Sequence, residues 1–247
     1  MQDWLLPILA APFIGSFLGV LIRRLPEGRP VVLARSACEA CGTPLGPRDL
    51  VPLGSYLMLR GRCRACGAPI GGFHPAVELA ALGVAAVAAA ALPGDAALLW
   101  LGCGLGWALL ALAWIDWDHL YLPDLLTLPL VPAGLVATWW LAPWRLADHA
   151  FGAALGYAAF RGLAWAYRWL RGRDGLGQGD AKLLAVAGAW LGWEALPQVV
   201  LLAALAGLGL AGGMALRRGG LDPAAPLPFG PCLALALWLC WLQAMAS

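Results

Sequence analysis

Eight runs of apolar residues divide this chain of 247 residues, and most of them are about as long as a membrane-spanning helix. A helix needs roughly 20 mostly apolar residues to cross the hydrocarbon core of a bilayer. Only 12% of the residues are charged, whereas soluble domains carry about 25%. The sequence therefore predicts an all-α polytopic membrane protein with about eight transmembrane helices. We expect these helices near residues 4–22, 76–92, 96–115, 120–142, 149–170, 181–193, 197–216 and 227–246.

The first and sixth of these runs differ from an ordinary span. Residues 4–22 are longer than the apolar region of a signal peptide, and no basic segment precedes them. We therefore expect them to be retained as the first helix. Residues 181–193 are short for a span of roughly 20 residues.

The distribution of arginine and lysine predicts the orientation in the membrane. The long polar connection, residues 23–75, carries eight arginines. If this connection is cytoplasmic, alternation of the helices places 116–119, 171–180 and 217–226 on the same side. Together with residues 23–75, these segments and their edges hold fourteen of the 16 basic residues, Arg145 lies on the other side, and Arg161 lies within a helix. The positive-inside rule then predicts that the long connection is cytoplasmic and that both termini face away from the cytoplasm.

The long connection contains two cysteine pairs with the spacing of zinc ligands. Cys38 and Cys41 form one CxxC motif, Cys63 and Cys66 form another, and a glycine follows each. This pattern is typical of a tetrahedral site with four thiolate ligands, which leaves no open position and favours a structural role for zinc. The alternative is a set of free or redox-active thiols. We expect three parts in the chain: a first helix (1–23), a cytoplasmic zinc-binding loop domain (24–75) and a seven-helix membrane core (76–247).

Carboxylates close to membrane spans are costly and usually functional. The predicted topology places Glu78, Asp116, Asp118, Asp124 and Asp180 at the cytoplasmic ends of their helices. Asp116 ends the third span and Asp180 begins the sixth, so two carboxylates distant in sequence share one depth. Two nearby carboxylates in a partly desolvated site share a proton, which is the basis of aspartic protease chemistry. Spacing alone does not choose between Asp116 and Asp118.

The approach to Asp180 is rich in glycine. Gly177 and Gly179 precede it, and such residues let a substrate backbone come close and let the site flex. Lys182, the only lysine of the chain, could orient a phosphate or carboxylate, but extending to the interface at the helix end is the simpler expectation. Asp124 and Glu78 each lie at the start of an expected helix, where an acidic residue stabilises the first turn. We therefore expect them to be first-turn acids or structural supports.

Seven segments of the chain resemble, in order, the motifs of bacterial prepilin peptidases, the type IV leader peptidase family of GxGD-type intramembrane aspartic peptidases. The resemblance covers nearly the whole chain. The segments are GSFLGVLIRRLP (15–26), CEACGTPL, GRCRACGAPI, HPAVEL (74–79), WIDWDHLYLPD, GLGQGDAKLL (175–184) and PFGP (228–231).

The resemblance implies an endopeptidase of the bacterial inner membrane that acts at the cytoplasmic face. It would cleave, after glycine, the basic leader of type IV prepilins or type II secretion pseudopilins, whose N-terminal helix lies in the bilayer. The catalytic pair carries over onto Asp116 and Asp180. Supporting or substrate-contacting roles fall to Gly177, Gly179, Lys182, Asp124 and Glu78.

Many members of the family also methylate the new N-terminus with S-adenosylmethionine, so the resemblance implies a bifunctional enzyme. The first-helix motif commonly reads GSFLNV, and Gly19 stands here at the asparagine position. The alternative is a peptidase without methyltransferase activity.

Two hypotheses from other functional classes remain open. The acids could form a proton or cation path of a transporter, although such sites usually lie near the bilayer midplane. The chain could also be a zinc-ribbon membrane adaptor with incidental carboxylates. No nucleic-acid partner is expected.

Overall fold

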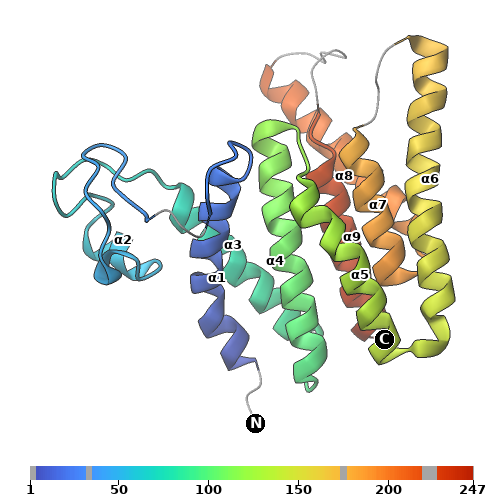
Figure 1. Cartoon of the computed structure of the whole chain (residues 1–247), viewed down its shortest axis with the longest axis horizontal. Helices are drawn as coiled ribbons and strands as arrows, with labels where there is room; N and C mark the ends of the chain where they lie inside the picture. The colour runs from blue at the N-terminus through green and yellow to red at the C-terminus, as the bar shows by residue number, and fades with distance from the viewer. Residues whose placement is uncertain (1–3, 32–34, 173–176, 219–226, 247) are drawn as a thin grey trace. The chain divides into compact units, whose positions relative to one another are not determined.

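The computed structural model describes residues 4–31, 35–172, 177–218 and 227–246. Within these ranges eight helices of 14 to 26 residues follow the eight predicted apolar segments in order (Figure 1), which confirms the all-α class. The helices are α1 (Leu5–Arg24), α3 (Phe73–Ala91), α4 (Ala96–His119), α5 (Asp124–Leu141), α6 (Leu146–Arg171), α7 (Gln178–Leu191), α8 (Leu196–Arg218) and α9 (Gly230–Ala246). The connection after α1 holds the short helix α2 (Gly54–Met58) and a 3₁₀ turn, η1 (Pro47–Asp49), and a second turn, η2 (Pro143–Arg145), precedes α6.

Among the described residues, five helices are long and apolar enough to cross a membrane, namely α1, α3, α4, α5 and α8. Three others fall short for different reasons. Helix α7 has 14 residues, which span about 21 Å against a hydrocarbon core of about 30 Å. Helix α9 is apolar but has 17 residues. Helix α6 is long, at 26 residues, but less apolar, and it carries Arg161 in its interior.

The chain divides into two compact units, Met1–Ala111 and Leu112–Ser247, and the boundary falls within α4. In the first unit α1 packs closely on α3, because a Cβ atom on Gly15 would lie only 2.6 Å from Glu78 Cα. Helix α4 adds a hydrogen bond, in which Trp107 Nε1 donates to the carbonyl oxygen of Ala81 over 2.9 Å. The predicted division at residues 23 and 75 stays a prediction.

Helix α7 is the centre of the second unit, where it packs against α5, α6 and α9. From Asp180 to Leu191 every residue except Lys182 is buried. The contact with α6 is so close that a Cβ atom on Gly188 would lie 2.1 Å from the Gly152 carbonyl carbon. One turn away, a Cβ atom on Gly156 would lie 2.6 Å from the Leu184 carbonyl oxygen. The small residues spaced four apart in both helices therefore allow this approach.

Two polar side chains tie α7 to its neighbours. Trp190 Nε1 donates to the Leu130 carbonyl oxygen on α5 over 2.8 Å. The buried His149 of α6 places Nδ1 at 3.1 Å from the Ala189 carbonyl oxygen on α7 and 2.8 Å from Thr138 Oγ1 on α5. A carbonyl oxygen only accepts, so Nδ1 carries the proton. One imidazole thus links three helices, a role that no motif in the sequence indicated.

The α6–α7 contact predicts that alanine substitutions at two glycines have different effects on the free energy of unfolding. Gly188→Ala is expected to lower the free energy of unfolding by about 1–3 kcal/mol, because the new methyl group meets backbone atoms that cannot rotate away. Gly162→Ala, on an open part of α6 where a Cβ atom meets nothing within 4 Å, is expected to be neutral or to stabilise by roughly 0.5–1 kcal/mol. Thermal unfolding in detergent measures both. Equal effects at the two positions would contradict the tight contact.

Candidate active site and cysteine centre

Asp116 and Asp180 line one pocket of about 330 Å³ in the second unit. Asp116 lies in the last turn of α4 and Asp180 in the first turn of α7, and each is only 7% exposed. The two carboxylates predicted from distant segments are therefore brought together, and they are close enough to repel each other when both are ionised. The remaining lining residues are Leu120, Tyr121, Leu122, Asp124, Gly177, Gln178, Gly179 and Lys182.

The carboxylate of Asp116 is held by the beginning of α9. The Gly230 N–H donates to Asp116 Oδ2 over 2.9 Å, and a helix N-terminus carries partial positive charge. A Cβ atom on Gly230 would lie 2.6 Å from the same oxygen, so only glycine lets the backbone approach this closely. The ring of Phe229 packs against Phe160 of α6, with centroids 6.4 Å apart. Gly230 belongs to the PFGP motif (228–231), and the sequence alone did not indicate this contact.

The glycines before Asp180 are explained by close packing. Gly177 is the N-cap of α7, and its N–H donates to the Asp180 carboxylate. A Cβ atom on Gly177 would lie 3.0 Å from Asp180 Oδ2, and one on Gly179 would lie 2.8 Å from Leu122 Cβ. The flexibility that the sequence suggested is therefore not needed to account for these two residues.

The chain reaches Leu122 through a strained turn. Leu120 ends α4 with a φ of 52°, a left-handed conformation that is uncommon for a residue other than glycine. Its N–H donates to the Asp116 carbonyl oxygen over 2.9 Å. The turn thus begins at the residue that carries one of the two carboxylates, and it directs Leu122 against Gly179.

Asp124 and Lys182 form an ion pair that the sequence did not predict. Asp124 lies in the first turn of α5, as expected, and its Oδ1 contacts Lys182 Nζ on α7. Lys182 is thus directed toward a carboxylate of this chain. Asp118, by contrast, is exposed and does not line the pocket. The structure therefore places Asp116, and not Asp118, beside Asp180.

Glu78 belongs to the first unit and has a different environment. It is 5% exposed, and its Oε2 accepts a hydrogen bond from the Leu53 N–H over 2.7 Å. Leu53 has a left-handed φ of 55° just before α2. Glu78 therefore attaches the connection after α1 to the start of α3, and its suggested role toward substrate stays a prediction.

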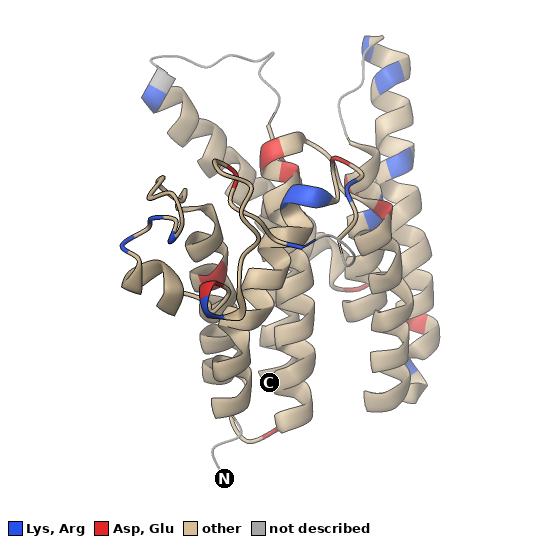
Figure 2. Ribbon diagram, turned by 60° about the vertical axis from the view of Figure 1, so that its left-hand side comes forward, with Lys and Arg blue, Asp and Glu red and all other residues tan. Residues whose placement is uncertain are grey.

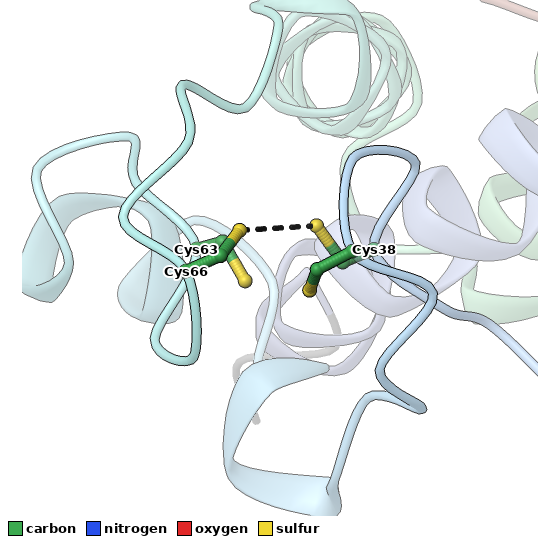
Figure 3. A group of neighbouring side chains, drawn as sticks. Cys38, Cys63 and Cys66 are labelled. Atoms are coloured by element: carbon green, nitrogen blue, oxygen red, sulfur yellow. Dashed lines mark hydrogen bonds between the residues drawn. The ribbon is translucent and has the colours of Figure 1, made fainter.

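The four predicted cysteine ligands lie together in the first unit. The Sγ atoms of Cys38, Cys41, Cys63 and Cys66 are all within 4.8 Å of one another, and those of Cys38 and Cys66 are 3.9 Å apart (Figure 3). Four Zn–S bonds of about 2.3 Å in a tetrahedron would place the sulfur atoms roughly 3.8 Å apart. The cluster fits a zinc ion after a small contraction.

The two cysteine motifs have the same backbone structure. In the first, Gly42 has a φ of 70° and its N–H donates to the Cys38 carbonyl oxygen over 2.9 Å. In the second, Gly67 has a φ of 72° and its N–H donates to the Cys63 carbonyl oxygen over 2.9 Å. Glycine adopts this left-handed conformation without strain, which explains why it follows each pair.

Neighbouring groups favour the charged forms of Cys41 and Asp49 in this unit. Hydrogen bonds from the side chain and backbone of Thr43 lower the pKa of the Cys41 thiol to about 6. Arg64 donates from Nε to Asp49 Oδ1 over 2.7 Å, and this contact, with the Gly46 N–H, lowers the pKa of Asp49. The second cysteine motif is thereby joined to the η1 turn.

Comparison with known proteins finds two family models that match this chain. Residues 9–92 match the family model described as the Bacterial Peptidase A24 N-terminal domain, and residues 103–212 match that of the Type IV leader peptidase family. The prepilin leader peptidase/N-methyltransferase of Burkholderia pseudomallei (strain K96243) is 44% identical over 246 residues, which cover 90% of this chain and 79% of that protein. This chain belongs to the type IV leader peptidase family. Its apolar helices and this membership make it a multi-pass protein of the inner membrane.

Other relatives bear the same name. The protein of Pseudomonas aeruginosa PAO1 is 38% identical over 261 residues, covering 95% of this chain and 88% of the relative. The protein of Aeromonas hydrophila is 42% identical over 262 residues, covering 96% and 89%. No solved structure matches the chain.

The cysteine cluster predicts one zinc ion per chain in the purified protein, measured by elemental mass spectrometry. Cys38→Ser combined with Cys66→Ser is expected to abolish the metal, because two thiolates do not complete a tetrahedral site. Cys103→Ser, a matched change at a buried cysteine of α4, is expected to retain it. A metal-free wild-type protein, purified without chelator, would refute the assignment.

Proposed function

We propose that this protein is an aspartic endopeptidase that removes the leader of type IV prepilins or type II secretion pseudopilins and then methylates the new N-terminus. The observation that carries the proposal is the pocket that Asp116 and Asp180 both line. The shared name of the relatives, prepilin leader peptidase/N-methyltransferase, supports both activities.

The peptidase reaction needs one ionised and one neutral carboxyl group. The ionised carboxylate takes a proton from water while the water oxygen attacks the carbonyl carbon of the glycine that ends the leader. The neutral carboxyl group donates its proton to the carbonyl oxygen, which gives a tetrahedral diol. The C–N bond then breaks as the carboxyl group that took the proton from water passes it to the leaving nitrogen. The other carboxylate takes a proton from a hydroxyl group of the diol, and the leader departs with a new carboxyl end. Asp116 and Asp180 finish in their initial protonation states and can act again.

The orientation and partners follow from the same proposal. Helix α6 carries Arg168 and Arg171 in its last turn, and the arginines of this helix gather toward that end (Figure 2), from which the chain leads on to Asp180 in the first turn of α7. By the positive-inside rule that end faces the cytoplasm. The substrate's own N-terminal helix would lie in the bilayer, with its cleavage site at the level of the pocket. The cysteine loop would face the same side, and its zinc would be structural because four thiolates fill the coordination sphere.

The methylation step would use S-adenosylmethionine, which supplies a methyl group to the free amine as the amine loses a proton. Gly19, at the position where asparagine is common, has a local reason. A Cβ atom there would lie 2.7 Å from His74 Nδ1, so the imidazole of α3 occupies the space beside α1. The departure from the family pattern is thus accompanied by a polar ring at the same place.

The decisive experiment uses purified protein in lipid and a substrate with a short basic leader ending in glycine, followed by an apolar helix. Mass spectrometry is expected to detect cleavage after glycine, and with S-adenosylmethionine a further gain of one methyl group. Asp116→Asn and Asp180→Asn should each abolish cleavage, because an amide cannot exchange the proton.

The matched control is Asp118→Asn, which makes the same change at an exposed residue outside the pocket. It should leave cleavage unchanged. Substantial cleavage by either dyad variant would remove that residue from the mechanism. Cleavage without methylation would establish the peptidase alone.

The contact between α9 and Asp116 gives a separate prediction. Gly230→Ala should reduce kcat by about 100-fold or more, because the methyl group displaces Asp116 Oδ2 and small misplacements of a catalytic group have effects of this size. Gly209→Ala on α8, where a Cβ atom meets nothing within 4 Å, should leave kcat unchanged. Activity assays on folded, monodisperse protein compare the two, and wild-type kcat in Gly230→Ala would contradict the role of this contact.

A further inference from the structure

The pocket contains an ion pair in addition to the two catalytic carboxylates. Lys182 Nζ contacts Asp124 Oδ1, and both residues line the pocket with Asp116 and Asp180. The side chain of Lys182 is 25% exposed and that of Asp124 is 55% exposed. The ammonium group of Lys182 is therefore partly desolvated. In such a place its electrostatic effect on the other carboxylates of the pocket depends on whether Asp124 is paired with it.

The geometry limits the alternatives open to this lysine. Lys182 lies two residues after Asp180 in the first turns of α7, and Asp124 begins α5. The close contact between Gly179 and Leu122 keeps the two helix ends together. Without a partner on α5, the ammonium would have the two carboxylates of Asp116 and Asp180 as the other acidic groups of the same pocket.

We propose that Asp124 is a positioning residue that holds Lys182 in an ion pair and so leaves the catalytic pair with its single shared proton. This inference rests on the proposed function. A free ammonium group beside two carboxylates would favour their doubly ionised form, and a doubly ionised pair has no proton to donate to the carbonyl oxygen. In the native pair the charges of Asp124 and Lys182 cancel, so the proton stays.

No other group near the pocket takes the place of Asp124 as the partner that neutralises Lys182 among the described residues. Cys232 of α9 is buried and interacts with the Asp116 charge, but a thiol cannot neutralise an ammonium group. Further titratable or charged groups lie on the elements that meet at this end. Among the described residues these are Asp118, His119, Tyr121, Arg161, Tyr167, Arg168, Arg171 and Arg217, of which Tyr167 is half-buried and the others are exposed.

The test is the pH dependence of leader cleavage, measured as kcat and kcat/KM in lipid. Activity should fall at high pH where the pair loses its last proton. Asp124→Asn leaves the positive charge of Lys182 without its partner and should move this fall in activity to lower pH. We expect a shift of about one pH unit, the order of magnitude for one additional charge in the same pocket. Lys182→Met leaves Asp124 uncompensated and should move it to higher pH. The double variant should return close to the wild-type profile.

Two controls separate charge from structure. Lys182→Arg keeps the positive charge and should keep the wild-type profile. Asp118→Asn removes one negative charge outside the pocket and should move the profile less than Asp124→Asn. Shifts of the same sign in the two single variants, or no shift in either, would overturn the proposal.

Loss of activity at every pH in both single variants and the double variant would also overturn it, because the pair would then have a purely structural role. Failure of the proposed function is distinguishable. It would appear as cleavage by Asp116→Asn or Asp180→Asn, whatever the profiles of the Asp124 and Lys182 variants show.

Discussion

Burying two carboxylates at the end of an apolar helical bundle is the unfavourable step that the second unit must accommodate. Each charge loses hydration, and the two charges repel each other. The structure offsets this cost with backbone donors, since Gly230 binds Asp116 and Gly177 binds Asp180. Both donors are glycines: a Cβ atom on Gly230 would lie 2.6 Å from its carboxylate oxygen, which excludes a side chain there, and one on Gly177 would lie 3.0 Å from its oxygen, which is a tight contact. The candidate site therefore depends on where the backbone of two helix ends is placed.

That placement depends in turn on the central position of α7. Its contact with α6 at Gly152 and Gly188 leaves no space for a side chain, and Trp190 and His149 fix it to α5 and α6 through hydrogen bonds. A helix of 14 residues is too short to be stable alone. Packing on α5, α6 and α9 supplies the stability that a helix of this length lacks. The same packing fixes the position of Asp180 relative to Asp116.

The sequence predicted the parts of this molecule that are encoded locally. The apolar runs predicted the helices, and the CxxC pairs predicted the cysteine cluster. The distribution of charged residues predicted that Asp116 and Asp180 lie on the same side of the membrane. It did not predict contacts that depend on distant packing, such as Gly230 with Asp116 or Asp124 with Lys182. A glycine before an apolar run has many uses, and only the folded chain shows which oxygen it approaches. The choice of Asp116 over Asp118 was open for the same reason, because a difference of two residues on a helix decides which side chain faces the pocket.

Apart from Tyr121, which lies between α4 and α5, the polar side chains of the pocket come from helix ends. Asp116 lies in the last turn of α4, while Asp124, Asp180 and Gly230 lie in the first turns of α5, α7 and α9. Helix N-termini present unpaired N–H groups and partial positive charge, so three of them around a carboxylate pair counter its repulsion without adding a mobile cation. Lys182, the one mobile cation among the residues that line the pocket, is held by Asp124. Fixed dipoles can stabilise a developing negative charge while leaving the shared proton in place, which a free ammonium group would not do. This arrangement is the physical reason that an apolar bundle can support acid–base chemistry at its edge.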